Sequence, residues 1–130
     1  MTEFACLLID DDTDDHELVL TGLRRTLASL RFITAKNGFE ALAILESVYR
    51  KPDLILLDLN MPIMDGRQFF AEFKKLPDLK SIPVVILTTS DDDQDRKDFL
   101  SMGAREFFTK PGSVDEWEKM LHQIVATYLS

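Results

Sequence analysis

Cysteine is almost absent from this chain of 130 residues, which has only Cys6. A single cysteine cannot form a disulfide within the chain, and Cys6 lies inside an apolar run, which indicates a small buried side chain in a reducing compartment. No charged start followed by an apolar secretory core is present, and no apolar stretch reaches the length of a membrane span. We therefore expect a soluble, cytoplasmic protein.

Basic residues are too few to balance the acidic ones. The chain has 15 Lys and Arg against 23 Asp and Glu, which gives a formal charge of −8. This charge repels the phosphate backbone of nucleic acid and the anionic surface of a lipid bilayer, so we expect neither as a partner. The sequence has no linker, repeat or low-complexity tract, and its length suits one hydrophobic core. We expect a single domain over residues 1–130, with no output domain.

Short apolar runs alternate with helical stripes of apolar residues along the whole chain. Strands are expected at Phe4–Asp10, Arg31–Ala35, Asp53–Asp58, Ile82–Thr88 and Arg105–Thr109. Helices are expected at Asp14–Leu30, from Asn37-Gly38 to before Pro52, from near Asp65 to Pro77, at Asp92–Met102 before Gly103, and along the stripe of Trp117, Leu121, Ile124 and Tyr128. Five strand–helix units with short connections predict an α/β fold, with a parallel sheet covered by helices on both faces.

Polar side chains follow four of the expected strands, at the point where each strand ends. They are Asp10 and Asp11, Asp58, Thr88 and Lys110. The carboxyl ends of parallel strands meet at one edge of the sheet, and ligands bind at that edge in open α/β sheets. Three carboxylates suit a hydrated hard cation such as Mg²⁺, and Lys110 supplies a positive charge opposite them. The proline after Lys110 can hold a fixed turn, in cis or in trans, that directs the lysine inward.

The remaining acids near the first strand have a simpler explanation. Asp12, Asp14, Asp15 and Glu17 fall in or near the first turn of the expected helix, where acidic residues are mildly stabilised by the helix dipole. A calcium-binding EF-hand loop is excluded, because a loop counted from Asp10 has Asp15 at its sixth position and Thr21 at its twelfth, where glycine and glutamate are needed.

Four blocks of the sequence carry a resemblance to a known family. They are Leu7 to Asp11, Leu57 to Gly66, Val85 to Ser90 and Phe107 to Pro111. These blocks resemble the signature blocks of the response-regulator receiver domain of two-component signalling, in the right order and over nearly the whole chain. The resemblance implies a flavodoxin-like, doubly wound fold with strand order 2-1-3-4-5, in a stand-alone regulator similar to those of chemotaxis.

The resemblance also implies roles for individual residues. Asp58 would accept a phosphoryl group from a histidine of a sensor kinase or of a phosphotransfer protein. Asp10 and Asp11 would hold Mg²⁺ or Mn²⁺ together with Asp58 and the backbone carbonyl of Asn60. Lys110 would bond the phosphoryl oxygens, and Thr88 would be the switch hydroxyl. Such a receiver catalyses its own phosphorylation and dephosphorylation without being an enzyme in the usual sense.

Three further positions would modulate the switch. Phe107 occupies the place of an aromatic residue that changes rotamer in the family; because it lacks a hydroxyl, its coupling must be by packing. Asn60 and Ser90 lie two residues past Asp58 and Thr88 and would flank the path of the hydrolytic water. The output would leave by the face of the fourth helix, fifth strand and fifth helix, toward a downstream protein or a second copy in a homodimer.

Other functions are possible on the same topology. A phosphatase with an aspartate nucleophile needs a second aspartate where this chain has Asn60, and it needs a substrate cap. A flavodoxin-type cofactor binder needs a hydroxyl- and glycine-rich phosphate loop, where this chain has acids. A degenerate receiver that only mediates contacts is the stronger rival, although every catalytic position is filled. The sequence leaves the kinase, the pathway, the target, the phosphoryl lifetime and the oligomeric state open.

Overall fold

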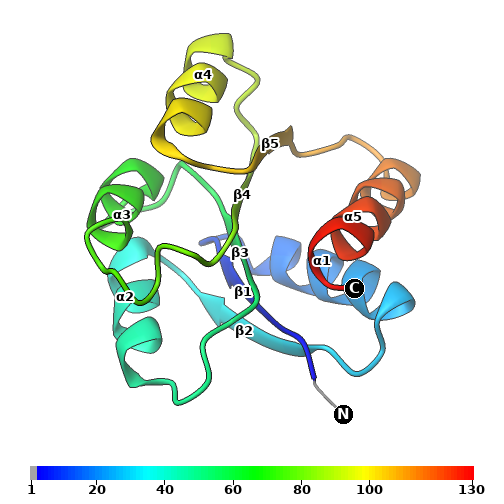
Figure 1. The fold of residues 1–130 in the computed structure, drawn as a ribbon. Helices are drawn as coiled ribbons and strands as arrows, with labels where there is room; N and C mark the ends of the chain where they lie inside the picture. Colours follow the sequence, from blue (N-terminus) through cyan, green and yellow to red (C-terminus); the bar gives the residue numbers. More distant parts are fainter. Residues whose placement is uncertain (1–2) are drawn as a thin grey trace.

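A central sheet carries helices on both of its faces in this computed structural model, which describes residues 3–130 (Figure 1). The strands are β1 (Ala5–Ile9), β2 (Arg31–Ala35), β3 (Leu54–Leu57), β4 (Val84–Thr88) and β5 (Glu106–Thr109). The helices are α1 (Thr13–Thr26), α2 (Gly38–Ser47), α3 (Gly66–Phe73), α4 (Asp93–Met102) and α5 (Val114–Tyr128). All strand pairs are parallel, in the order β2-β1-β3-β4-β5, so the expected fold class and strand order are confirmed.

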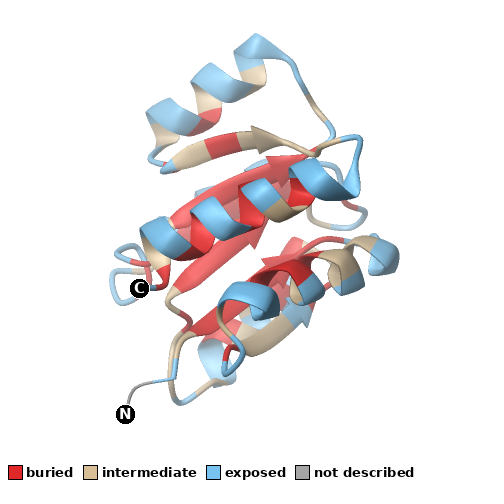
Figure 2. Cartoon of the chain, turned by 90° about the vertical axis from the view of Figure 1, so that its right-hand side faces the viewer, coloured by how far each residue is buried: buried red, intermediate tan, exposed pale blue. Residues whose placement is uncertain are grey.

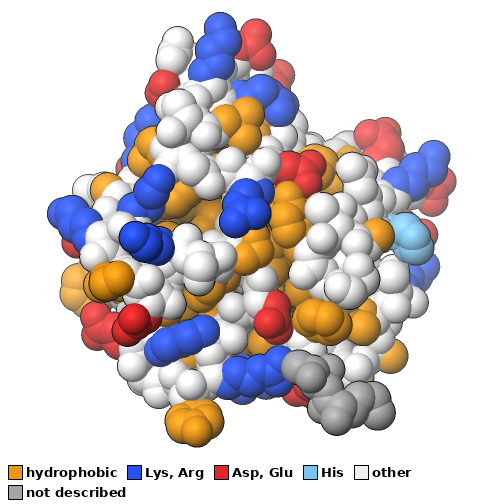
Figure 3. Space-filling view, in the orientation of Figure 1, with side chains coloured by type: hydrophobic (Ala, Val, Ile, Leu, Met, Phe, Trp, Pro, Cys, Tyr) orange, Lys and Arg blue, Asp and Glu red, His pale blue; other side chains and the backbone are white. Residues whose placement is uncertain are grey.

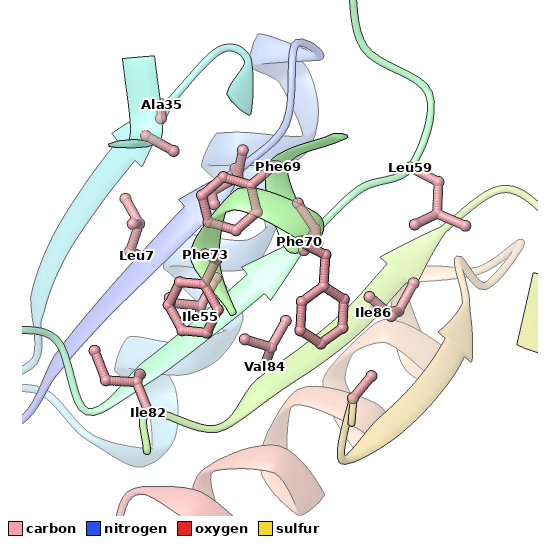
Figure 4. Close-up of a cluster of buried hydrophobic side chains, with 14 of the residues drawn as sticks. Leu7, Ala35, Ile55, Leu59, Phe69, Phe70, Phe73, Ile82, Val84 and Ile86 are labelled. Carbon is pink, nitrogen blue, oxygen red and sulfur yellow. The ribbon is translucent and has the colours of Figure 1, made fainter. Parts of the chain in front are cut away.

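The sheet separates two hydrophobic cores. On one side α2, α3 and α4 cover the strands, and aromatic side chains of α3 such as Phe70 and Phe73 pack beside Ile55 and Val84 (Figure 4). On the other side α1 and α5 turn their buried residues toward the sheet and their exposed residues outward (Figure 2). The strands between the cores are apolar on both faces, as expected for a parallel sheet covered on both sides.

Three helices end earlier than their apolar patterns predict. The helix expected to end just before Pro52 ends at Ser47, because Val48 has an extended backbone. The helix expected over Asp14–Leu30 ends at Thr26, because Leu27 leaves the helical conformation and the N–H of Leu30 bonds to the Leu27 carbonyl. The helix expected to reach Pro77 ends at Phe73 and continues as tight turns. After α1 and α3, the leucines past the helix end still pack against a core, namely Leu27 and Leu30 after α1 and Leu76 and Leu79 after α3. Their spacing therefore resembles that of a helix although they lie in turns.

Each helix begins soon after a strand ends, with a side chain that caps its N-terminus. The capping residues are Asp12, Asn37, Asp65, Asp92 and Ser113. Helix α4 is closed by Gly103 at φ 114°, as the sequence predicts. Short connections of this kind bring the residues after the strands to one end of the sheet. Within residues 3–130, no helix combines the length and the apolarity that crossing a membrane requires.

Candidate functional site

Three carboxylates meet at the carboxyl end of the sheet. Asp10 follows β1 and Asp58 follows β3, which is the neighbouring strand, and the N–H of Asp58 bonds to the Ile9 carbonyl at 2.9 Å. Carboxylate oxygens of Asp10, Asp11 and Asp58 lie within 4.8 Å of one another. Asp10 and Asp58 are buried, whereas Asp11 is exposed. Hard oxygen donors at this spacing, open to water on one side, fit a partly hydrated divalent cation.

Lys110 reaches this cluster from the end of β5. Its Nζ donates to Asp10 Oδ2 at 2.8 Å and lies 3.8 Å from Asp58 Oδ2. Its backbone N–H bonds to the Thr88 carbonyl, and the peptide bond to Pro111 is trans, since residues 3–130 contain no cis bond. The structure therefore brings the predicted lysine to the predicted carboxylates.

Burial and charge shift the protonation of this cluster. Desolvation raises the pKa of Asp58 to about 6, and the negative charge of Asp10 adds to the rise. The Lys110 charge, a hydrogen bond from the Thr88 hydroxyl and one from the Leu59 N–H act in the opposite direction. Burial alone would lower the pKa of Lys110, but its hydrogen bonds to Asp10 and Asp15 outweigh that effect and raise it. The lysine is thus fully charged, and the carboxylates still carry excess negative charge that a cation would neutralise.

Two of the predicted residues beside the cluster make different contacts. Thr88 is fully buried at the end of β4, and its hydroxyl interacts with Asp58. Ser90 donates from its hydroxyl to Asp95 Oδ2 at 2.7 Å, so it is bound to α4. Asn60 is exposed in the loop between β3 and α3. The positions of Ser90 and Asn60 relative to a hydrolytic water stay predictions.

Phe107 is buried on β5 and is held by an arginine that sequence reasoning missed. The Arg96 guanidinium carbon lies 4.9 Å from the centre of the Phe107 ring, and Nη1 of Arg96 donates to the Phe107 carbonyl at 2.8 Å. This cation–π contact and hydrogen bond tie α4 to the aromatic residue. Nothing in the local sequence indicates the pair, because its two residues belong to different elements.

Two residues of the first helical turn also belong to the site. Asp15, which the sequence explains by the helix dipole alone, accepts a hydrogen bond from Lys110 Nζ at 2.6 Å. The Nε2 atom of His16 lies 2.6 Å from the Asp10 carbonyl oxygen. The interpretation of Asp15 was therefore incomplete. No local signal separates Asp15 from Asp14, because both lie in the first turn of α1 and the partner, Lys110, comes from the end of β5.

Comparison with known proteins gives one consistent result. The sequence matches the family model of the response regulator receiver domain over residues 7–122. It is 36% identical over 128 residues to response regulator Rcp1 of Synechocystis sp., a match that covers 95% of this chain and 87% of Rcp1. It is 30% identical to protein PilH of Pseudomonas aeruginosa, covering 94% of this chain and 98% of PilH. In a longer relative, sensor histidine kinase CheAY of Helicobacter pylori, the match covers only 14% of the protein.

Solved structures agree with the sequence matches. The phosphorylated cyanobacterial phytochrome response regulator RcpA superposes with a TM-score of 0.92 at 32% identity, covering 99% of this chain and 96% of RcpA. The Mn²⁺-bound form of Rcp1 superposes with a TM-score of 0.85 at 35% identity, covering 95% and 92% of the two chains.

Proposed function

Since this chain belongs to the response regulator receiver domain family, we propose that Asp58 accepts a phosphoryl group from a histidine of a sensor kinase or of a phosphotransfer protein. The observation that carries the proposal is the position of the Asp58 carboxylate. It is buried beside two further carboxylates and lies 3.8 Å from the Lys110 ammonium. A nucleophile flanked by a lysine and a cation-binding cluster suits the transfer of an anionic group.

The carboxylates would hold the metal ion. Asp10, Asp11 and Asp58 would be the protein ligands, and the backbone carbonyl of Asn60 would be a further donor. The Mn²⁺-bound form of Rcp1 supports divalent metal binding in receivers of this kind, and Mg²⁺ is the hard cation that we expect here. When bound, such an ion neutralises charge on the oxygens of the transferring group.

The chain's own residues supply the rest of the reaction. An oxygen of Asp58 attacks phosphorus, the bond from phosphorus to the donor histidine nitrogen breaks, and the nitrogen keeps the electron pair. Lys110 bonds the phosphoryl oxygens and offsets their charge. Water then attacks the acyl phosphate, which releases inorganic phosphate and restores Asp58, with Asn60 and Ser90 beside its path. The protein thus catalyses both its own phosphorylation and its own dephosphorylation.

The signal would leave through α4, β5 and α5. The Thr88 hydroxyl is drawn to the phosphoryl group, and the chain after Thr88 continues through Ser90, which bonds Asp95 of α4. On the same helix, Arg96 donates a hydrogen bond to the Phe107 carbonyl of β5, and its guanidinium group lies over the Phe107 ring. A displacement of Thr88 therefore reaches α4 and β5 through direct contacts, and a downstream protein that docks there would respond to it.

Labelling with acetyl phosphate and Mg²⁺ tests the proposal. We expect one phosphoryl group per chain, on Asp58, detected by intact-mass spectrometry. Asp58→Asn removes the nucleophile and should abolish labelling, whereas Lys110→Ala should still bind the metal but lose the coupling between phosphorylation and shape. Labelling that persists in Asp58→Asn would show that another residue is the acceptor.

A further inference from the structure

Asp15 differs from the other acids that begin α1. Its carboxylate accepts from Lys110 at 2.6 Å, and its side chain is only 19% exposed. Asp14, in the same helical turn, is exposed and makes no ion pair among the described residues. The charge of Asp14 is therefore explained by the helix dipole, whereas that of Asp15 is directed at one particular lysine.

The contacts of Lys110 leave one of its hydrogen-bond donors free. A lysine ammonium has three N–H donors. One is bonded to Asp10 Oδ2 at 2.8 Å and one to Asp15 Oδ2 at 2.6 Å. Asp58 Oδ2, at 3.8 Å, is too far for a hydrogen bond. The two carboxylates therefore fix the lysine and leave its third donor for an oxygen placed at Asp58.

Asp10 cannot fix the position of the Lys110 ammonium group alone. Its Oδ1 already accepts from the N–H of Asp12, its Oδ2 accepts from Lys110, and it belongs to the carboxylate trio. A cation in the trio would compete with Lys110 for Asp10. Asp15 lies outside the trio, so its carboxylate stays available to the lysine.

The start of α1 places Asp15 rigidly. The side chain of Asp12 accepts from the N–H groups of Asp14 and Asp15, which fixes the first turn directly after β1. The ammonium group of Lys110, by contrast, is attached through a flexible chain of four carbon atoms. A carboxylate on a fixed helix start can thus hold a mobile ammonium group in place.

We propose that Asp15 is a positioning residue, which tethers Lys110 so that its free donor faces a phosphoryl group on Asp58. This inference rests on the proposed function of Asp58. Without the tether, Lys110 would lose its fixed orientation, and its contribution to holding the phosphoryl oxygens would fall.

The test measures the affinity for beryllofluoride, a phosphoryl analogue, in the presence of Mg²⁺. We expect Asp15→Asn to bind it roughly tenfold more weakly, about what the net loss of one hydrogen bond costs. Asp14→Asn removes the same charge from the same helical turn and should bind as the wild type does. Equal affinities of Asp15→Asn and Asp14→Asn would overturn the inference, and so would tighter binding by Asp15→Asn, which would mean that Asp15 restrains the lysine.

A double-mutant cycle separates positioning from a general effect on the fold. In a Lys110→Ala background, Asp15→Asn should have no further effect on beryllofluoride affinity, because the residue acts only through the lysine. An undiminished effect in that background would contradict the tether. Asp15→Ser, which suits a helix start, serves as a second variant if Asp15→Asn folds poorly. If wild-type protein neither binds beryllofluoride nor labels at Asp58, the proposed function itself fails, and this inference fails with it.

Discussion

The protonation of a single residue, Asp58, affects both reactivity and stability. Burial raises its pKa from 3.8 to about 6, so the metal-free carboxyl becomes protonated as the pH falls below about 6. Only the carboxylate is a nucleophile and a metal ligand, so Mg²⁺ must compete with this proton. Labelling by acetyl phosphate at a limiting Mg²⁺ concentration should therefore decrease below pH 6, and a rate at limiting Mg²⁺ that is flat between pH 5 and pH 8 would contradict this.

The same shift predicts a pH-dependent difference in stability. A carboxyl group whose pKa is raised in the folded state stabilises the fold below its unfolded value of 3.8, and this contribution is lost as the pH rises through about 6. Asp58→Asn cannot ionise, so above pH 6 without metal it should be more stable than the wild type. Below pH 4 the difference should disappear. Urea denaturation in the presence of a chelator measures both regimes.

Asp11 has a separate role at the same site. It is the exposed member of the carboxylate trio, so removing its charge should disturb metal binding with little effect on the fold. We expect the affinity of Asp11→Asn for Mg²⁺ to be lower than that of the wild type by about tenfold or more. A hydrated hard ion depends on few protein charges, so the loss of one of them is large. Calorimetry is preferable to fluorescence, since Trp117 is buried in the core on the α1 and α5 side of the sheet and is not among the site residues. Unchanged affinity in Asp11→Asn, with Asp14→Asn as the control for charge, would refute the site.

At the scale of elements, the packing of α3 against the end of β3 depends on Gly66. A Cβ at this position would lie 2.7 Å from the Asp58 carbonyl oxygen and 2.8 Å from the Leu59 Cα, which are both backbone atoms. Gly66→Ala should therefore lower the free energy of unfolding by about 2 kcal/mol or more, within the upper range for overpacking. Gly112→Ala is the matched control, because no atom lies within 4 Å of its added Cβ. Equal stability of the two variants, measured by urea denaturation, would contradict this account of the loop.

The loop between β3 and α3 also contains backbone strain. Ile63 has a φ of 69°, and the N–H of Met64 bonds to the Pro62 carbonyl, which makes a γ-turn around a β-branched residue. The residue is 81% exposed, so little burial offsets the strain. Ile63→Gly should raise the free energy of unfolding by up to about 1 kcal/mol, since relieved strain exceeds the entropy cost of glycine.

Val114 provides the control for this substitution. It is another exposed β-branched residue, and its φ is not positive. Val114→Gly should therefore lower stability, because it brings the entropy cost of glycine without relief of strain. If thermal denaturation shows that Ile63→Gly is destabilised as much as Val114→Gly, the γ-turn is not a source of strain.

Charge is distributed unevenly over the molecule as a whole. On the face shown in Figure 3, acidic and basic side chains are interspersed. The end of β1 and the start of α1, by contrast, concentrate acidic residues, namely Asp10, Asp11, Asp12, Asp14 and Asp15. A cation, or a phosphodonor protein that carries basic residues, is therefore attracted to this end of the sheet.

Phosphorylation should change the molecule around β5, the strand at one edge of the sheet. With beryllofluoride and Mg²⁺, we expect altered hydrogen exchange over α4, β5 and α5. Ser90–Asp95 and Arg96–Phe107 link α4 and β5 to Thr88, and the Tyr128 hydroxyl of α5 donates to Glu106 of β5. Asp58→Asn should show no change. Changes confined to α1 and α2 would mean that the signal leaves by another route. Sedimentation of the same samples would show whether this face also forms a symmetric dimer.

The sequence by itself determined the order of the elements and the edge at which the chemistry lies. Apolar runs too short for helices alternate with helical stripes, and this alternation leads to a parallel sheet. Since parallel strands end at the same edge, Asp10, Asp58 and Lys110 had to lie along that edge. The spacing of apolar residues is enough to predict the order of helices and strands, because each spacing is a property of one helix or one strand.

Only the tertiary structure decided which side chains of that edge touch. Asp14 and Asp15 have the same charge and the same helical turn in the sequence, yet only Asp15 meets Lys110, which is 95 residues away. Arg96 and Phe107 pair across α4 and β5 for the same kind of reason. Such contacts depend on how far each helix is rotated and shifted over the sheet. That placement follows from the packing of both cores together, and no single segment of sequence contains it.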